Sequence, residues 1–162
     1  MSVLSGEMIR LHSIITPHVP RTEIEFEGRK LSFGQGFAGY DVRVEFEEGQ
    51  DAWMFEPGEF RLASTIEHFR MRSDIIAEVK DKSSWARRGI TVQNTVIEPG
   101  WRGHLTLELT NHSRQYITIQ RGMPIAQILF YQIEFTQQEI AHGLKGYDGK
   151  YQDQERGPQD AR

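Results

Sequence analysis

Cysteine is absent from this 162-residue sequence. Its absence excludes disulfides, thiolate metal sites and the cysteine-containing zinc centre of the common nucleobase deaminases, whose signature includes Pro-Cys-x-x-Cys. Long apolar runs are absent too: none approaches the roughly 18 residues of a membrane span, and the N-terminus lacks a basic region followed by an apolar one. We therefore expect no membrane segment, no secretory signal and a cytoplasmic location.

The sequence has no excess of positive charge, since 19 Lys and Arg stand against 23 Asp and Glu, a formal net charge of -4. General nucleic-acid binders usually need a basic surface to displace counterions from phosphates, so we expect no nucleic-acid partner. A small anionic ligand needs only a local basic cluster. The apolar content of 38% is enough for one compact core in a chain of this length.

Apolar and polar residues alternate along much of the chain, which predicts strands. In residues 40–46 (YDVRVEF) the alternation predicts a half-buried strand, with Val42 and Val44 on one face and Asp41 and Glu45 on the other. The other predicted strands are IIAEVKD (75–81), HLTLELTN (104–111), YITIQ (116–120), IAQILFYQIEF (125–135) and two short strands in WMFEPGEFRLAS (53–64) around the Pro57-Gly58 turn.

Elsewhere the local signals are weaker. Prolines and glycines break the first forty residues, which we expect to be irregular with one or two short strands, and SSWARRG (83–89) predicts a short helix. The whole pattern predicts an all-β sandwich, jelly roll or barrel. We divide the chain into a β domain, residues 1–140, and a polar tail, residues 141–162, which buries too little surface to be ordered by itself.

Residues 81–111, DKSSWARRGITVQNTVIEPGWRGHLTLELTN, carry the strongest signal for chemistry. A cluster of cations and hydroxyls at its start, Lys82, Ser83, Ser84, Arg87 and Arg88, could bind a polyphosphate. Glu108 stands alone in an apolar and threonine-rich strand, where a carboxylate could act as a base. A phosphate site beside a proton acceptor suggests nucleotide chemistry.

Six separated blocks resemble the dCTP deaminase family of the trimeric dUTPase-like superfamily, from about Gly39 to the C-terminus. They are AGYDVRV, PGEFRLAST, KSSWARRGI, IEPGWRGHLTLELTN, GMPIAQILF and GYDGKYQDQERGP, in the family's order. Six ordered blocks are far more specific than one motif. The resemblance implies a distorted jelly-roll or β-barrel of the dUTPase-like type, with a flexible C-terminal lid.

The implied activity is hydrolytic, zinc-independent deamination of dCTP to dUTP and ammonia, in pyrimidine deoxynucleotide supply. The resemblance also implies a homotrimer whose sites are shared between neighbouring subunits, and Mg²⁺ held by the nucleotide triphosphate rather than by protein ligands. The six histidines show no ligand spacing such as HExxH, which agrees with a reaction that needs no zinc.

The family's roles can be carried over by position. Glu108 would be the general base, and Ser83 and Arg87 would hold the base and its water. Tail residues would close over the nucleotide as a lid ordered by substrate. The positions implied to bind nucleotide are Lys82, Ser84, Glu98, Thr106, Leu107, Gln127, Tyr147, Lys150 and Gln154.

Three departures from the family pattern leave alternatives open. Asp81 replaces a glycine beside the phosphate segment, Glu98 replaces an aspartate, and ITVQNTVIE (90–98) is about two residues shorter than its counterpart. GITVQN is also similar to a dUTPase motif, in which a carboxylate at the position of Glu98 would direct water to phosphorus. The alternatives are a bifunctional enzyme that forms dUMP and pyrophosphate, and a non-catalytic regulatory trimer that binds nucleotide.

Overall fold

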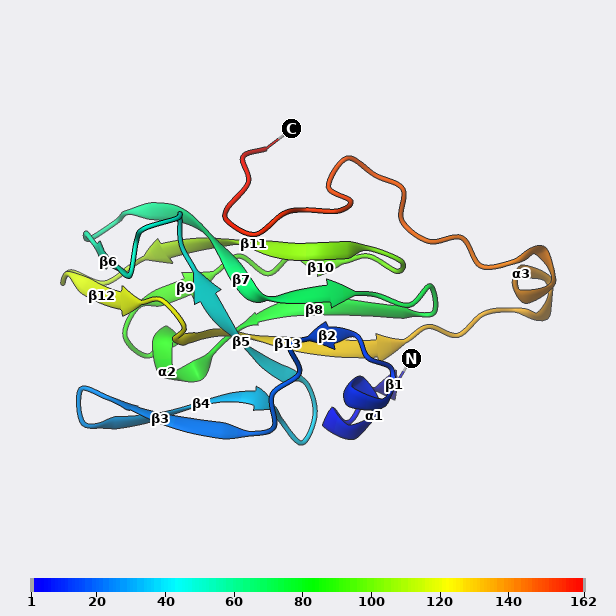
Figure 1. Cartoon of the computed structure of the whole chain (residues 1–162), viewed down its shortest axis with the longest axis horizontal. Coiled ribbons are helices and arrows are strands. Elements are labelled where there is room, and N and C mark those ends of the chain that lie inside the picture. Colours follow the sequence, from blue (N-terminus) through cyan, green and yellow to red (C-terminus); the bar gives the residue numbers. More distant parts are fainter. Residues whose placement is uncertain (1, 162) are drawn as a thin grey trace.

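A curled antiparallel sheet forms the body of the protein in the computed structural model, which describes residues 2–161 (Figure 1). The strands are β1 (Ser2–Val3), β2 (Ile15–Thr16), β3 (Thr22–Phe26), β4 (Arg29–Gln35), β5 (Tyr40–Glu45), β6 (Ala52–Phe55), β7 (Phe60–Arg70), β8 (Ile75–Asp81), β9 (Ile90–Val92), β10 (Val96–Ile97), β11 (Arg102–Asn111), β12 (Ile117–Gln120) and β13 (Pro124–Gln132). Three short helices complete it: α1 (Gly6–Leu11), α2 (Ser83–Ala86) and α3 (Gln137–His142).

The main sheet has the order β10-β8-β13-β5-β7-β11-β9, while β6 and β12 pair with each other beside it. Most strands that are neighbours in the main sheet come from distant parts of the sequence. Tyr40, Phe69, Trp85 and Phe130 are among the largest fully buried side chains and lie in the core that the curled sheet encloses. The all-β prediction is confirmed, and so are the strands predicted over residues 40–46, 53–64, 75–81, 104–111 and 116–120 and the short helix α2. The strand predicted over residues 125–135 is also present, but it ends at Gln132.

The prediction that β5 is half-buried was wrong, because the strand is buried on both faces. Asp41 is 9% exposed and Glu45 4%, although both lie on the polar face of the pattern. Each carboxylate has a cation: Lys82 Nζ lies 2.6 Å from Asp41 Oδ2, and Arg121 Nε lies 2.6 Å from Glu45 Oε1. Ion pairing therefore replaces solvent on that face.

The prediction of largely irregular structure in the first forty residues was also wrong. This region holds α1, the short strands β1 and β2, and a complete hairpin of β3 and β4. The hairpin turns at Glu27 and Gly28, which both have positive φ. Its inward side chains, Ile24, Phe26 and Leu31, pack on the core, so tertiary contact stabilises strands whose own pattern is weak.

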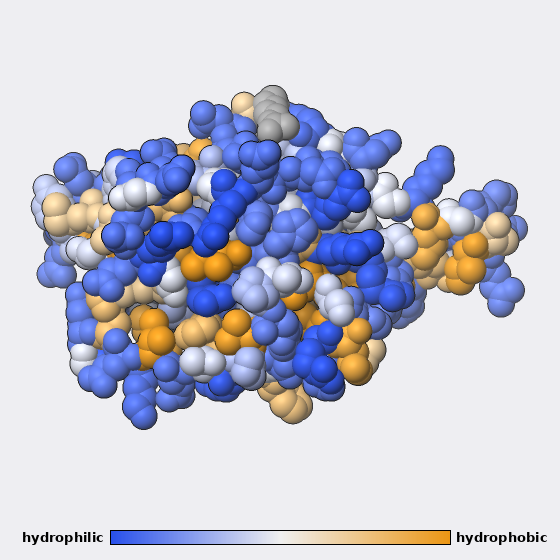
Figure 2. Space-filling view, viewed as in Figure 1, coloured by the Kyte–Doolittle hydropathy of each residue, from blue (hydrophilic) through white to orange (hydrophobic). Residues whose placement is uncertain are grey.

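Helix α3 protrudes from the body (Figure 1). None of its residues is buried, Ile140 is 60% exposed, and Figure 2 shows hydrophobic side chains on this protrusion. A capping box holds its first turn: the Thr136 hydroxyl accepts from Glu139 N at 3.3 Å, and the Glu139 carboxylate accepts from Thr136 N at 2.8 Å. Helix α3 is therefore stabilised by its N-terminal capping box and not by packing against the rest of residues 2–161.

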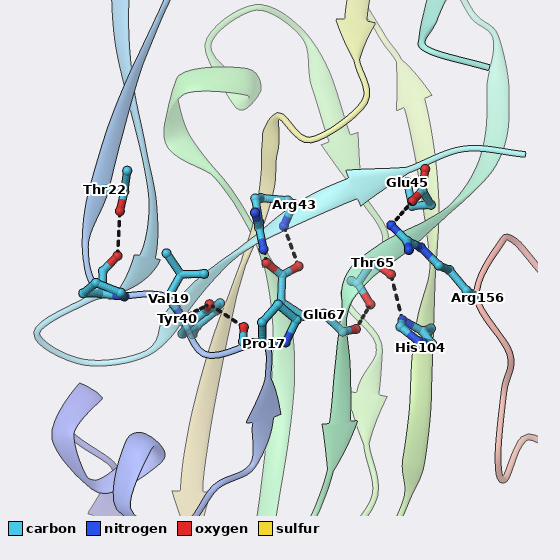
Figure 3. Close-up of polar contacts among 11 residues, drawn as sticks. Pro17, Val19, Thr22, Tyr40, Arg43, Glu45, Thr65, Glu67, His104 and Arg156 are labelled. Carbon is cyan, nitrogen blue, oxygen red and sulfur yellow. Dashed lines mark hydrogen bonds and ion pairs between the residues drawn. The ribbon is translucent and has the colours of Figure 1, made fainter. Parts of the chain in front are cut away.

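A buried ion pair links β5 to β7 (Figure 3). The Glu67 carboxylate is fully buried and accepts from Arg43 twice, from its Nε at 2.8 Å and from its backbone N–H at 2.9 Å. The Arg43 guanidinium also lies 5.1 Å from the centroid of the Phe33 ring. Both oxygens of the buried carboxylate therefore depend on one residue.

We expect Arg43→Ala to lower the free energy of unfolding by about 3 kcal/mol, because it leaves a buried carboxylate without its cation. Urea unfolding at one fixed protein concentration measures the loss. Arg10→Ala is the control: it removes an arginine from an exposed ion pair with Glu7, where a much smaller loss is expected because solvent screens the charges. Equal losses in the two variants would show that burial of Glu67 does not set the cost.

Candidate active site

Strand β11 places Glu108 on its half-buried face. The burial alternates along the strand, with Leu105, Leu107 and Leu109 in the core and Thr106 and Glu108 on the other side. Glu108 lies opposite Leu62 of β7 in the antiparallel register, and its backbone carbonyl accepts from Gln93 N at 3.0 Å. The lone carboxylate that the sequence singled out therefore has its backbone fixed on both sides.

Glu108 lines a cavity of about 590 Å³. Strands β7, β10 and β11, the segment from Thr95 to Trp101 and the C-terminal tail enclose it. Its lining residues are Phe60, Leu62, Thr95, Val96, Ile97, Glu98, Trp101, Leu105, Thr106, Glu108, Tyr147, Tyr151, Gln154, Gln159, Asp160 and Ala161. The cavity thus brings together five of the predicted site residues: Glu98, Thr106, Glu108, Tyr147 and Gln154.

The environment of Glu108 favours its protonated form. Its Oε2 is buried and has no hydrogen-bond partner among residues 2–161. Burial raises the pKa of the Glu108 carboxyl above its ordinary value of 4.5. A carboxyl group that lines a cavity and has a raised pKa is suited to accept a proton there and release it again.

The C-terminal tail lies along the start of β11 and over the cavity (Figure 1). Tyr147 N donates to Pro99 O at 2.7 Å, the Trp101 indole N–H donates to Tyr151 O at 2.7 Å, and Gln159 N donates to Thr106 Oγ1 at 3.2 Å. The tail is therefore joined at several points to the segment from Pro99 to Thr106, which runs from the turn into β11.

The Pro99-Gly100 turn does more than reverse the chain. Gly100 has a φ of 80°, and a Cβ there would lie 2.5 Å from the Cα of Gly146. A side chain at Gly100 would therefore collide with the tail backbone. Glycine serves both the turn and the close approach of the tail.

An ion pair anchors the far end of the tail (Figure 3). The Arg156 guanidinium pairs with Glu45, whose carboxylate also pairs with Arg121. The Glu45 side chain is only 5% exposed, so the tail arginine compensates a charge that is largely out of solvent. Gln159, three residues after Arg156, again lines the cavity.

We expect Arg156→Ala to loosen the tail without unfolding the body, because Glu45 keeps Arg121 as a partner. Hydrogen–deuterium exchange over residues 152–161 should become faster in this variant. Arg121→Ala is the matched control, since it removes the other arginine from Glu45 and leaves the tail attached. Unchanged exchange in Arg156→Ala would show that the ion pair does not hold the tail.

The basic segment does not reach this cavity. Ser83 and Arg87 are exposed in and just after α2, and neither is among the lining residues. Lys82 is largely buried in its ion pair with Asp41. Asp81 turns its carboxylate to the backbone, where Oδ1 accepts from Val92 N at 2.7 Å. The carboxylate that interrupts the phosphate segment therefore fixes the start of the shortened 90–98 segment.

Three other predicted residues lie outside the cavity lining. Leu107 is fully buried in the core. Gln127 lies on β13 between Lys80 of β8 and Asp41 of β5. Lys150 lies on the tail with its Nζ 4.9 Å from the centroid of the Tyr151 ring.

The sequence did not single out much of the apolar wall. Phe60, Leu62 and Leu105 line the cavity, as does Trp101. Trp101 is 5% exposed, and the centroid of its ring lies 6.3 Å from that of the Phe69 ring. The position of Trp101 directly after the Pro99-Gly100 turn is the one sequence feature that could have pointed to it as a lining residue. No sequence feature pointed to Gln159 or Asp160 in the tail.

The cavity lining is acidic. Among residues 2–161 it contains the carboxylates of Glu98, Glu108 and Asp160 and neither lysine nor arginine. Over the same residues no group of three or more His, Asp or Glu is arranged to hold a metal ion. No helix there is long and apolar enough to span a bilayer. The cavity described can hold a neutral ring but offers no cation to a phosphate.

Comparison with solved structures defines the fold. The dUTPase of Staphylococcus bacteriophage 80alpha superposes with a TM-score of 0.52 at 15% identity, covering 83% of this chain and 92% of that chain. The dUTPase from Streptococcus mutans gives a TM-score of 0.50 at 19% identity, covering 76% and 95%. The chain therefore has a dUTPase-like fold, which confirms the predicted fold type.

Comparison of sequences defines the family. A family model described as dCTP deaminase-like matches residues 26–133. The dCTP deaminase of Acidovorax sp. (strain JS42) is 34% identical over 185 residues, covering 95% of this chain and 96% of the relative. That of Pseudomonas putida F1 is 34% identical with the same coverage. The chain belongs to the dCTP deaminase family, as the six blocks predicted.

Proposed function

We propose that this protein is a homotrimeric dCTP deaminase that hydrolyses the 4-amino group of dCTP to give dUTP and ammonia, without zinc. The observation that carries this proposal is that Glu108, whose Oε2 is buried without a hydrogen-bond partner among residues 2–161, lines a cavity of about 590 Å³. The family relationship to named dCTP deaminases supports the same reaction.

Glu108 would accept a proton from the attacking water while the water oxygen forms a bond to C4 of cytosine and the C4=N3 π bond opens, leaving its electron pair on N3. The same proton would pass to the amino nitrogen, and the C4–N4 bond would then break with loss of ammonia as the N3 electron pair re-forms the bond to C4. Transfer of the remaining hydroxyl proton to N3 would give the 4-oxo group of dUTP. A raised pKa suits both steps, because the group must bind the proton and then give it up. Thr106 lies two residues before Glu108, on the same face of β11, and also lines the cavity. It would contact the pyrimidine.

A neighbouring subunit would complete the site. A cavity with three carboxylates and no cation in its described lining repels a triphosphate, so cations must come from outside it. Ser83, Arg87, Lys82 and Ser84 lie together on another part of the chain. Their placement on a neighbouring subunit would bring charge and hydroxyl donors to the nucleotide held beside Glu108.

The tail would close over the bound nucleotide as a lid, using Tyr147 and Gln154 from the cavity lining and Lys150 from the same segment. Mg²⁺ would be held by the triphosphate, since this ion keeps most of its waters and needs few protein ligands. The absence of a cluster of three ligating side chains within residues 2–161 is compatible with that arrangement.

A second candidate function is the bifunctional reaction, in which dUTP is cleaved further to dUMP and pyrophosphate. The specific observation in its favour is that Glu98 lines the same cavity as Glu108. Two carboxylates in one cavity could serve two water molecules, one directed to carbon and one to phosphorus.

Incubation of the purified protein and Mg²⁺ with dCTP, dUTP and a 5-substituted dCTP tests these functions. Ammonia release with accumulating dUTP supports the deaminase, and ammonia with dUMP and pyrophosphate supports the bifunctional enzyme. Pyrophosphate from dUTP without ammonia would assign the chemistry to Glu98. Nucleotide binding without any product would identify a regulatory trimer and overturn the proposal.

A further inference from the structure

The side chain of Gln152 in the tail joins three separate stretches of backbone. Its Oε1 accepts from Arg102 N at 2.9 Å. Its Nε2 donates to Gly100 O at 3.1 Å and to Tyr147 O at 3.3 Å. One amide group therefore connects the Pro99-Gly100 turn, the first residue of β11 and the start of the tail.

Gln152 does not line the cavity that Glu108 lines, but the tail residues around it do. Tyr147, Tyr151 and Gln154 are lining residues, and Gln154 is 8% exposed. Gln152 can therefore act on the cavity through the position of these three residues.

Backbone hydrogen bonds continue the same attachment. Asp153 N donates to Arg102 O at 2.9 Å, and His104 N donates to Gln154 O at 3.0 Å, so the tail runs alongside the start of β11 (Figure 1). Any residue at these positions could form the backbone bonds. The bridge from Gln152 to the turn and to the start of the tail needs a long side chain with an N–H donor.

The tail segment from Tyr147 to Gln152 is a compact turn. Gln152 N donates to Gly149 O at 3.2 Å, and Tyr151 N donates to the Tyr147 hydroxyl at 3.4 Å. A Cβ at Gly149 would lie 2.4 Å from Cζ of Tyr147, so glycine lets the backbone cross that ring. The bond from Gln152 Nε2 to Tyr147 O closes this turn. The same side chain therefore fixes the shape of the turn and attaches it to the body.

The neighbouring ion pair is a weaker attachment. The Asp153 carboxylate pairs with the Arg102 guanidinium, and both side chains are more than half exposed. Solvent screens such a pair, so it contributes little to the position of the tail. The bonds from Gln152 to Gly100 O and Tyr147 O are partly buried, where water competes less.

We propose that Gln152 is a positioning residue, whose amide holds the tail against the turn and β11 and thereby sets the affinity for nucleotide. Its three partners are backbone groups of the protein itself, so this attachment does not require a nucleotide atom. A ligand binds more weakly, in proportion, when the form competent to bind it is only a fraction of the protein. The identity of that ligand as dCTP rests on the proposed function, whereas the attachment of the tail does not.

Hydrogen–deuterium exchange over residues 147–154 tests the attachment in Gln152→Ala. The polar tail buries little surface, so its attached form is favoured only modestly. Loss of the three side-chain bonds should weaken attachment by about tenfold and leave the tail mostly open, with exchange close to that of an unstructured peptide. The KM for dCTP should then rise by about three- to tenfold with kcat within about twofold of wild type, because Gln152 does not line the cavity.

Gln152→Glu separates the donor from the bulk of the side chain. Glutamate keeps the length and the acceptor for Arg102 N, but its carboxylate cannot donate to Gly100 O or Tyr147 O. It should open the tail at least as much as alanine does. Gln137→Glu is the matched control, since Gln137 is exposed in α3 and does not line the cavity. It should change neither the exchange nor the KM.

Wild-type exchange in either Gln152 variant would overturn the attachment. Faster exchange with an unchanged KM would overturn the role in nucleotide binding, and so would a fall in kcat at unchanged KM, which would place Gln152 in the chemical step. If wild type releases no ammonia, the proposed function fails. Exchange still decides whether Gln152 holds the tail in that case, and calorimetric titration with dCTP decides whether the tail sets the affinity.

Discussion

Glu108→Gln is expected to lower kcat for ammonia release from dCTP by about 10² to 10⁴-fold, the usual contribution of a positioned general base. Glutamine preserves the shape of the side chain and removes the proton acceptor. Its amide should keep most of the nucleotide affinity, so the loss belongs in kcat rather than KM. Steady-state ammonia release and titration of the variant with dCTP measure the two quantities separately.

The stability of this variant provides the control. Because the pKa of Glu108 is raised in the folded protein, the folded state binds the proton more tightly than the unfolded state. The free energy of unfolding therefore falls as the pH rises from about 4.5 through the raised pKa, and glutamine cannot ionise, so it escapes this loss. Glu108→Gln should be at least as stable as wild type at pH 7.

A variant that is both inactive and less stable at neutral pH would point to a structural role for Glu108. Full activity in a folded Glu108→Gln protein would contradict the mechanism outright. Glu98→Gln is the matched variant, since it removes the other glutamate of the same cavity. It should leave ammonia release from dCTP within about tenfold of wild type if Glu108 alone handles the proton.

Local pattern was enough to predict most of the sheet and to single out a carboxylate, Glu108, that lines the cavity. The alternation in HLTLELTN corresponds to β11 and left Glu108 as its one carboxylate, and the Pro99-Gly100 turn was visible as a dipeptide. Both signals depend on residues that are close in sequence. Two-residue periodicity and turn chemistry act over that same short range.

The features that were missed depend on contacts between distant segments. Asp41 and Glu45 are typical of a solvent-facing strand edge, yet Lys82, Arg121 and Arg156 arrive from elsewhere to neutralise them. The strands β3 and β4 likewise gain their stability from packing on the core. No local pattern reports such partners, because propensity is a weak influence beside tertiary contact.

The separation of Glu108 from Ser83 and Arg87 leads to the second large effect. If the site is shared, a mixture of Glu108→Gln and Arg87→Ala subunits should regain activity that neither variant has alone. In a mixed trimer, the intact Glu108 of an Arg87→Ala subunit meets the intact Arg87 of a Glu108→Gln neighbour. Each mixed trimer therefore contains one complete site, whichever variant is in the majority.

The expected recovery is quantitative. Random assembly from equal amounts makes about three quarters of the trimers mixed, each with about one complete site in three, so about a quarter of wild-type activity should return. Unfolding the two variants together, refolding them and following ammonia release from dCTP measures the recovery. Each variant refolded by itself is the control. A site contained within one subunit cannot be rebuilt by mixing the two variants. Ammonia release no greater than the sum of the two controls would therefore contradict the shared site. The cations would then have to reach Glu108 within the same chain.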